Sequence, residues 1–470
     1  MTAIRIEADY LFRRPGSLPA ERGAVIALGD PGSAPVIRLG GSGTIVMPAP
    51  ANAHDHGRAL SPVAFGASDR PLEAWIPATA LLPAVDPYLQ GLVAFGRLAA
   101  AGVAATQVAY DPLRLDDLPG EAEKVARAAR EVGIRVGLAL PVLDRNLGGY
   151  VDKQRFTAEL DVATREAFET ADSSLPPIAD QVAAVEEAAR LAEGGGVSVH
   201  FHAVGPTWCS PELMEMVAER SAATGRRVFM HLLETRRQRA WLDRTFDGDP
   251  IGKMDRAGLL SPRLGCAHGV HLREDEIALL AERGVTLSVN TSSNLRLNSG
   301  IAPVPAFLRH GLAMGIGLDS LGFGDTPDLF TEMRLMRLVH SDGSMRRPVD
   351  DPVPFEALQA GHRLAGDASE GKDWVVIDYE ALAPERSDER ADPIQLMLTR
   401  LSARHVTDLV VDGRVVLADR KLTGINLPEV ERALASAARS AKATGSPAIA
   451  SALSAAATRY FARGEARGSG

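Results

Sequence analysis

The sequence has 470 residues, 46% of them hydrophobic and 24% charged, which suits a large globular chain and excludes a disordered or fibrous one. Its formal net charge of −9 argues against a nucleic-acid-binding protein and fits a small-molecule substrate. The chain has two cysteines, no apolar signal-peptide run at its start and no stretch near ~20 consecutive apolar residues. We therefore expect a cytoplasmic protein that does not cross a membrane, with a homodimer as the default assembly.

The first 48 residues form short extended segments broken by Gly and Pro. Short β-rich runs then alternate with amphipathic segments whose apolar residues recur at helical spacing. Eight such runs are typical of a closed parallel barrel, so we predict an α/β fold with a (β/α)8 TIM-like barrel over residues 49–365. The predicted strands are 43–50, 102–110, 133–143, 196–203, 226–232, 263–270, 284–290 and 313–319.

Strand-like alternation returns after the barrel, in the same style as the first 48 residues. The economical interpretation is one small β-sandwich domain assembled from residues 1–48 and 366–426, with the barrel inserted between its two parts. Residues 427–470 are rich in Ala and Ser and contain charges. They are predicted to form a helical tail on the surface or at a subunit contact.

Ligand-type side chains fall at the carboxyl ends of four predicted strands. His54 and His56 are two residues apart, a spacing that points both side chains the same way on an extended chain. His231, His268 and Asp319 close the fifth, sixth and eighth strands. Any one of these could be an ordinary buried histidine, but five at strand ends favour a metal site. Three imidazoles and a carboxylate suit one divalent ion, zinc first, with iron, cobalt or manganese as alternatives.

Glu234 follows His231 in the segment HLLET. This is not the HExxH helix of a metalloprotease, because the strand ends at His231 and the chain then turns. The carboxylate can lean over the metal site without binding the ion, as a proton shuttle would. The alternative is a charge that stabilises the N-terminus of the following helix.

At this point the sequence resembles the amidohydrolase superfamily, in its cytosine deaminase and triazine hydrolase branch. The resemblance covers nearly the whole chain, including the divided β-domain. The segments that carry it are GTIVMPAPANAHDH, VFMHLLET, LGCAHGVHL, SVNTSSNLRLNSGIAPV and GIGLDSLGFGDTPDLFTEMRLMRLVH.

The resemblance implies one metal ion and assigns a role to each residue. His268 would orient or polarise the substrate or the water, Glu234 would move protons to the leaving group, and Asp319 would accept the proton of the attacking water. No lysine lies between Lys153 and Lys253, which excludes the lysine-bridged binuclear arrangement of other members. The implied metal ligands are His54, His56, His231 and Asp319.

The segment after the first strand departs from the deaminases of this branch. Many of these have a small residue inside HxH and a methionine three positions beyond, whereas this chain has Asp55 and Ala59. The stretch HDHGRALSPVAFGASDRPLEAWI is more similar to phenylurea and molinate hydrolases. We therefore predict hydrolysis of a carbamoyl, amide or urea C–N bond in a small neutral molecule. The alternative is hydrolytic deamination of a purine, pterin or triazine ring.

Six further residues are candidate substrate contacts. His202 follows the fourth strand, three aromatic residues could form an apolar wall, and Arg58 could clamp a carboxylate or carbonyl. Each also has an ordinary explanation, as a loop hydrogen bond, core packing, a surface charge or a turn cap. The set is Arg58, Trp75, His202, Trp208, Asn294 and Phe323.

Overall fold

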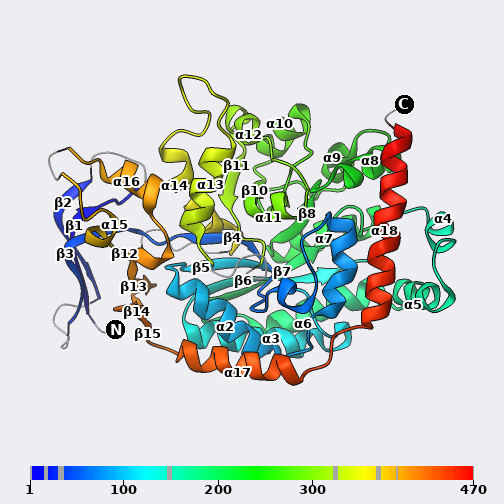
Figure 1. The fold of residues 1–470 in the computed structure, drawn as a ribbon, viewed down its shortest axis with the longest axis horizontal. Coiled ribbons are helices and arrows are strands. Elements are labelled where there is room, and N and C mark those ends of the chain that lie inside the picture. The colour runs from blue at the N-terminus through cyan, green and yellow to red at the C-terminus, as the bar shows by residue number, and fades with distance from the viewer. Residues whose placement is uncertain are drawn as a thin grey trace.

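Eight parallel strands form a nearly closed barrel in this computed structural model (Figure 1), which describes residues 3–14, 20–29, 36–145, 151–320, 327–366, 372–387 and 390–468. Each strand pairs with the next one in the chain, and the first and last approach where the backbone N–H groups of Leu318 and Asp319 donate to the carbonyl of His54. The predicted fold class is confirmed. The strands are β4 (Ala51–Asp55), β5 (Ala105–Ala109), β6 (Arg135–Val142), β7 (Val197–Ala203), β8 (Val228–Leu232), β9 (Leu264–His268), β10 (Thr286–Val289) and β11 (Ala313–Ile316).

The prediction for the first barrel strand was wrong. Residues 43–50 belong mainly to β3 (Ile37–Pro48) of a separate sheet, and the barrel begins only at β4. Ile45 and Met47 pack into the main core, while Val46 faces a second apolar cluster on the other side. A strand buried on both faces is apolar throughout in any sheet, so its pattern does not reveal which sheet it joins.

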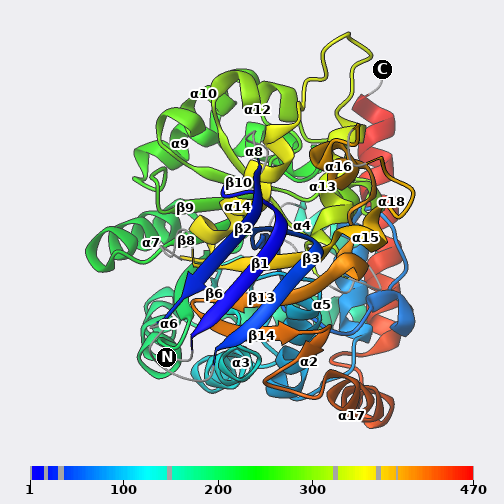
Figure 2. The ribbon, with the colours of Figure 1, turned by 90° about the vertical axis from the view of Figure 1, so that its left-hand side faces the viewer.

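The two chain ends share a second, seven-stranded sheet, shown in front of the barrel in Figure 2. The strands β1 and β3 are parallel, and the other pairs are antiparallel. Within the described residues the strands form one continuous mixed sheet, where a β-sandwich was expected. Its order is β15 (Lys421–Leu422), β14 (Arg414–Ala418), β13 (Val406–Val411), β12 (Trp374–Asp378), β3, β1 (Ile4–Leu11) and β2 (Glu21–Leu28).

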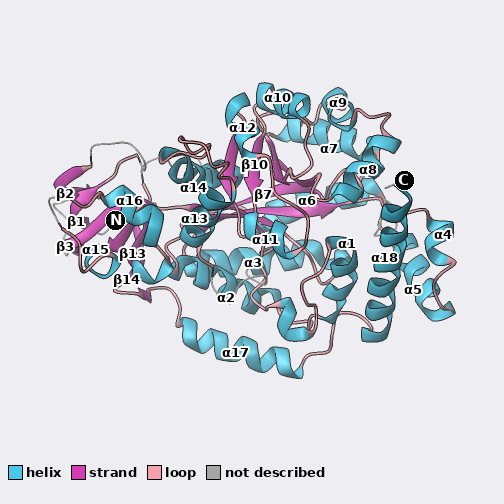
Figure 3. Cartoon of the chain, turned by 45° about the horizontal axis from the view of Figure 1, so that its top comes forward, coloured by secondary structure: helices cyan, strands magenta, loops and turns pink. Residues whose placement is uncertain are grey.

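Helices surround the barrel on its outer side (Figure 3). Their local sequence explains them: in α3, for example, buried Ala122, Val125, Ala129 and Val132 recur at helical spacing, and Gly133 ends the helix with a φ of 97°. The helices are α1 (Leu72–Trp75), α2 (Pro87–Ala100), α3 (Leu118–Val132), α4 (Lys153–Thr157), α5 (Val162–Ser173), α6 (Ile178–Ala192), α7 (Pro211–Thr224), α8 (Arg236–Thr245), α9 (Pro250–Arg256), α10 (Glu274–Glu282), α11 (Thr291–Arg296), α12 (Val304–His310), α13 (Leu329–Val339), α14 (Pro352–Leu364), α15 (Tyr379–Leu382), α16 (Pro393–Arg400), α17 (Leu427–Ser440) and α18 (Pro447–Gly468).

The last two helices lie against the barrel domain rather than apart from it. Arg97 of α2 pairs with Glu431 of α17 at 2.7 Å, and Ser454 of α18 donates a hydrogen bond of 2.6 Å to the carbonyl of Ala74 in α1. In the part of the chain that the structure describes, no helix is both long enough and apolar enough to span a membrane.

The last residues of α14 pack against the amino-terminal ends of the barrel strands. Small side chains at the start of the strands leave room for the end of α14: Ala365 packs against Ala51 and Ala105. The preceding residue, Leu364, packs against Phe229 inside the barrel. The opposite mouth, where the strands end, is thus the accessible end for a functional site.

A methyl group on Gly361 of α14 tests this close approach. Its Cβ would lie 2.3 Å from the carbonyl oxygen of Ala51, so backbone atoms would have to move. We expect Gly361→Ala to lower the free energy of unfolding in urea by about 1–3 kcal/mol. The control is Gly464→Ala in α18, where no atom lies within 4 Å, and it should not destabilise the chain. Equal stability of the two variants would contradict the packing of α14 described above.

Candidate active site

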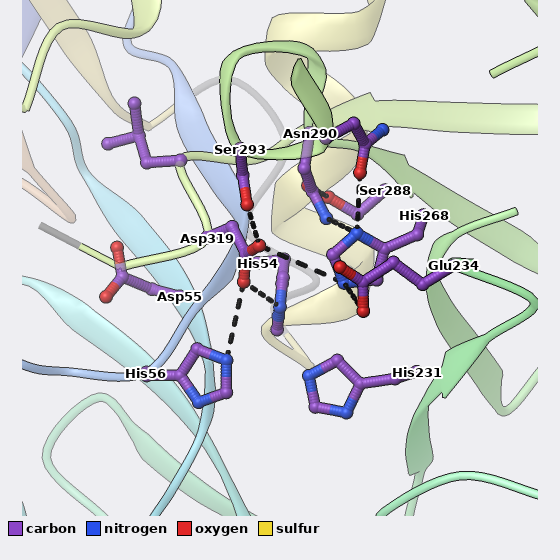
Figure 4. Close-up of polar contacts among 12 residues, drawn as sticks. His54, Asp55, His56, His231, Glu234, His268, Ser288, Asn290, Ser293 and Asp319 are labelled. Carbon is purple, nitrogen blue, oxygen red and sulfur yellow. Dashed lines mark hydrogen bonds and ion pairs between the residues drawn. The ribbon is translucent and has the colours of Figure 1, made fainter. Parts of the chain in front are cut away.

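The five predicted ligand-type residues converge at the carboxyl ends of the barrel strands (Figure 4). One ligand atom each from His54, His231, His268 and Asp319 lies within 4.8 Å of all the others. His56 borders this group, with its Nε2 3.4 Å from Oδ1 of Asp319. The protein thus contains a His/His/His/Asp cluster at the mouth of the barrel.

Two of these residues have unusual backbone conformations. His268 has a φ of 76° and Asp319 a φ of 55°, in the left-handed region that non-glycine residues rarely adopt. Such conformations cost free energy and persist where the surrounding structure holds them. They turn both side chains toward His54, whose backbone carbonyl accepts a hydrogen bond from the N–H of Asp319.

The donor set fits a divalent cation. Burial lowers the pKa of His54 to about 4 and holds the pKa of His231 well below its usual range, so both rings are neutral. Burial would raise the pKa of Asp319, but His54 and His268 outweigh this effect and keep the carboxylate ionised. Nε2 of His54 lies 2.8 Å from Oδ1 of Asp319. Among the described residues, Nδ1 of His54 and Nε2 of His268 have no hydrogen-bond partner. A cation satisfies such an arrangement.

Neighbouring groups orient the imidazoles of two of these histidines. Nδ1 of His231 lies 2.9 Å from the carbonyl oxygen of Val204, and Nδ1 of His268 lies 2.9 Å from Oδ1 of Asn294. Nδ1–H of His231 therefore donates outward and leaves its Nε2 as the acceptor that faces the cluster. Ser293 also donates a short hydrogen bond to Oδ2 of Asp319.

Sequence analysis missed Asp111, which follows β5. Its Oδ2 lies 2.8 Å from Nδ1 of His56 and also accepts a hydrogen bond from Arg58. Burial lowers the pKa of His56, but Asp111 outweighs it and the pKa rises to about 10. His56 must therefore release a proton to bind a metal. The signal was available, since Asp111 directly follows the predicted strand 102–110, at the end of the barrel where His231 also lies.

Glu234 is buried beside the cluster. Its Oε2 lies 3.6 Å from Nε2 of His268, and Ser299 donates a hydrogen bond of 3.1 Å to its Oε1. Burial raises the pKa of Glu234 to about 7. A carboxyl group with this pKa can both accept and donate a proton near neutral pH.

The raised pKa of Glu234 predicts a pH-dependent stability in chelator-treated protein. Between its ordinary value of 4.5 and its folded value of about 7, the folded chain keeps a proton that the unfolded chain has released. The free energy of unfolding should therefore fall by up to about 3 kcal/mol as the pH rises through this window. In Glu234→Gln this part of the pH dependence should be absent. Urea unfolding of both proteins at pH 5 and pH 7 measures the difference. A gap between them that does not change with pH would contradict the raised pKa.

The six candidate substrate contacts lie in different surroundings. Nε2 of the buried His202 lies 3.4 Å from Nδ1 of His231, behind that ring. Trp75 is buried in a cluster with Leu72 and Leu297. The carbonyl of Trp208 accepts hydrogen bonds from the backbone of Asp144 and Arg145. Arg58 pairs with Asp111, Asn294 bonds to His268, and Phe323 lies outside the described residues.

Known proteins resemble this chain in sequence and in fold. A 5'-deoxyadenosine deaminase of Methanothermobacter thermautotrophicus is 27% identical over 84% of this chain and 86% of its own length. A 5-methylthioadenosine/S-adenosylhomocysteine deaminase of Pelotomaculum thermopropionicum is 26% identical over 94% of this chain and 96% of its own. The crystal structure of an adenosine deaminase of Xanthomonas campestris with bound zinc has a TM-score of 0.75 and 20% identity, over 93% of this chain and 98% of that one.

The model of the Amidohydrolase family matches residues 45–361, a range that begins before β4 and ends within α14. This range includes every strand of the barrel and all five residues of the cluster. The chain therefore belongs to the amidohydrolase family, and it is a hydrolase of carbon–nitrogen bonds other than peptide bonds.

Proposed function

We propose that this protein is a metal-dependent hydrolytic deaminase that removes the exocyclic amino group of an aminopurine nucleoside. This is the alternative of the sequence analysis, which favoured urea or carbamate hydrolysis. Two curated relatives that align over more than four fifths of the chain bear the names of adenosine-type deaminases. The observation that carries the proposal is the buried carboxyl group of Glu234 beside His268, because a departing amino nitrogen needs a proton.

We further propose that the cation is held by His54, His56, His231 and Asp319, with His268 beside them. The neutral imidazoles of His54 and His231 and the carboxylate of Asp319 are ligands that zinc prefers. His56 joins them once it has released its proton. A bound divalent cation would lower the pKa of water and make hydroxide available at neutral pH.

The side chains around the cluster divide the proton transfers. Oδ2 of Asp319, oriented by the hydroxyl of Ser293, accepts a proton from the attacking water. Nε2 of His268, which has no hydrogen-bond partner within the described chain, stabilises the charge that develops on the substrate. Oε2 of Glu234 then donates a proton to the leaving nitrogen.

A substrate panel tests the reaction. Zinc-loaded protein is incubated with 5'-deoxyadenosine, 5-methylthioadenosine and S-adenosylhomocysteine, and in parallel with a phenylurea and a thiocarbamate. We expect one ammonia for each purine consumed, together with the absorbance change from the aminopurine to the oxopurine ring. Amine release from the urea or thiocarbamate, with no ammonia from any purine, would overturn the proposal.

One observation favours that second reaction. Arg58 lies in the segment that departs from the deaminase pattern, and its guanidinium pairs with the Asp111 carboxylate beside His56. A guanidinium this close to the cluster can donate hydrogen bonds to a carbonyl oxygen of a urea or carbamate. The panel decides between the two reactions.

A further inference from the structure

A basic cavity lies between three helices at the periphery of the barrel. It encloses about 720 Å³ between α8, the end of α18 and the segment from Val151 to Arg155 at the start of α4. These helices lie together in both Figure 1 and Figure 3. The volume is typical of sites for small organic molecules. None of the lining residues belongs to the metal cluster or to the proposed proton-transfer groups.

The cavity concentrates positive charge on a protein of net charge −9. Four arginines line it against a single carboxylate, Asp152. Arg237 is paired with Glu73, but the structure, over the residues it describes, shows no ion pair for the other three, Arg155, Arg236 and Arg244. By contrast Arg239, also on α8 but outside the cavity, is paired with Asp243 and Glu276.

Aromatic rings form another part of the wall. Trp241, Tyr460 and Phe461 line the cavity and are each only partly buried. The guanidinium of Arg145 lies 5.7 Å from the centre of the Trp241 ring, and the hydroxyl of Tyr460 accepts a hydrogen bond from the backbone N–H of Asp152. Guanidinium groups without an ion pair, next to partly exposed aromatic rings, can bind an anionic group and stack a planar ring at the same time.

We propose that this cavity is a binding site for a small organic anion, a molecule that joins a phosphate or carboxylate to a planar ring. Arg155, Arg236 and Arg244 bind the anionic group, and Trp241 packs against the ring. The site adjoins the catalytic loop, because Glu73 accepts hydrogen bonds from both Arg237 and the hydroxyl of Thr235, the residue that follows Glu234.

Three probes that share the uracil ring separate the contributions of charge and ring. Uridine 5′-monophosphate carries a phosphate, orotate carries a carboxylate, and uridine carries neither, while none has the exocyclic amine that a deaminase would remove. In calorimetric titrations of the full-length, metal-loaded protein we expect at least one of the two anions to bind and uridine to bind at least about tenfold more weakly. The tighter anion identifies the preferred acidic group. Binding of the anion should weaken as the salt concentration rises.

The double variant Arg236→Ala/Arg244→Ala should weaken anion binding at least about tenfold while retaining the bound metal. The matched control is Arg432→Ala/Arg439→Ala on the exposed face of α17, which removes the same charge elsewhere and should leave binding unchanged. Failure of both anions to bind, equal binding of uridine, or an anion affinity unchanged in Arg236→Ala/Arg244→Ala would overturn the proposal. So would binding that survives this double variant but is lost on chelation, because the ligand would then be at the metal centre.

Discussion

Replacing Glu234 by Gln is expected to lower turnover by about 10²–10⁴-fold while the metal content stays at the wild-type level. Gln keeps the size of the side chain and can still accept the hydrogen bond from Ser299, but it cannot transfer a proton. Glu234 faces Nε2 of His268 from a buried position, so a carboxylate from the solvent cannot take over its proton transfer. Steady-state kinetics and metal analysis on the same preparation measure both quantities.

The matched control is Glu332→Gln. Glu332 is also buried and its carboxylate accepts a hydrogen bond of 2.8 Å from the backbone N–H of Ser292, a contact that Gln can retain. Its variant should lose less than about tenfold in turnover. Full activity of Glu234→Gln would remove the proton-transfer role, whereas an equal loss in both variants would indicate a general effect on the site.

The second large effect concerns the metal ligands. Chelation of the protein should abolish activity, and added zinc should restore it. Loss of a residue that only supports a metal ligand typically weakens metal binding by roughly 10–100-fold. His56→Ala removes a proposed ligand and should weaken metal binding by more than this. His268→Ala should keep the ion and lose about 10²–10³-fold in turnover, because it removes a group that stabilises developing charge.

The His56 and His268 variants distinguish two possible sets of metal ligands, because the distances between ligand atoms alone suggest a set other than the proposed one. The group of closest ligand atoms contains His268 rather than His56, whose ring is held by Asp111 through Nδ1. Metal retained in His56→Ala and lost in His268→Ala would establish His54, His231, His268 and Asp319 as the ligands. Inductively coupled plasma analysis of the two variants, after gel filtration, gives the answer.

Much of the barrel could be predicted from local patterns. Seven of the eight predicted runs overlap observed barrel strands, because a parallel strand covered by helices is apolar along its length, whereas the apolar residues of the helices recur every three or four positions. The boundary between β3 and β4 could not be predicted, since Ile45 and Ala51 are equally buried in different sheets. Backbone hydrogen bonds to neighbouring strands, and not the periodicity of the sequence, decide which sheet β3 and β4 join.

The approach of His54, His56, His231, His268 and Asp319 was also predictable, since the carboxyl ends of the strands of a parallel barrel meet at one mouth. Their supports were harder to see. Asp111 holds His56, Ser293 bonds to Asp319 and Asn294 bonds to His268. Asp111 directly follows a predicted strand and Asn294 was expected to contact the substrate or cap a turn, but serines, asparagines and aspartates are common in loops, so the sequence did not show that these residues support the ligands.

The sequence alone thus determined the order of the elements, the barrel and the identity of the residues at its mouth, because these depend on short-range periodicity and on where polar residues interrupt it. The tertiary structure alone decided how α14 fills the far end, which small side chains orient the histidines and how Arg155, Arg236 and Tyr460 come to line one cavity. Those contacts join segments far apart in the chain, and only the packing of the helices around the barrel brings them together.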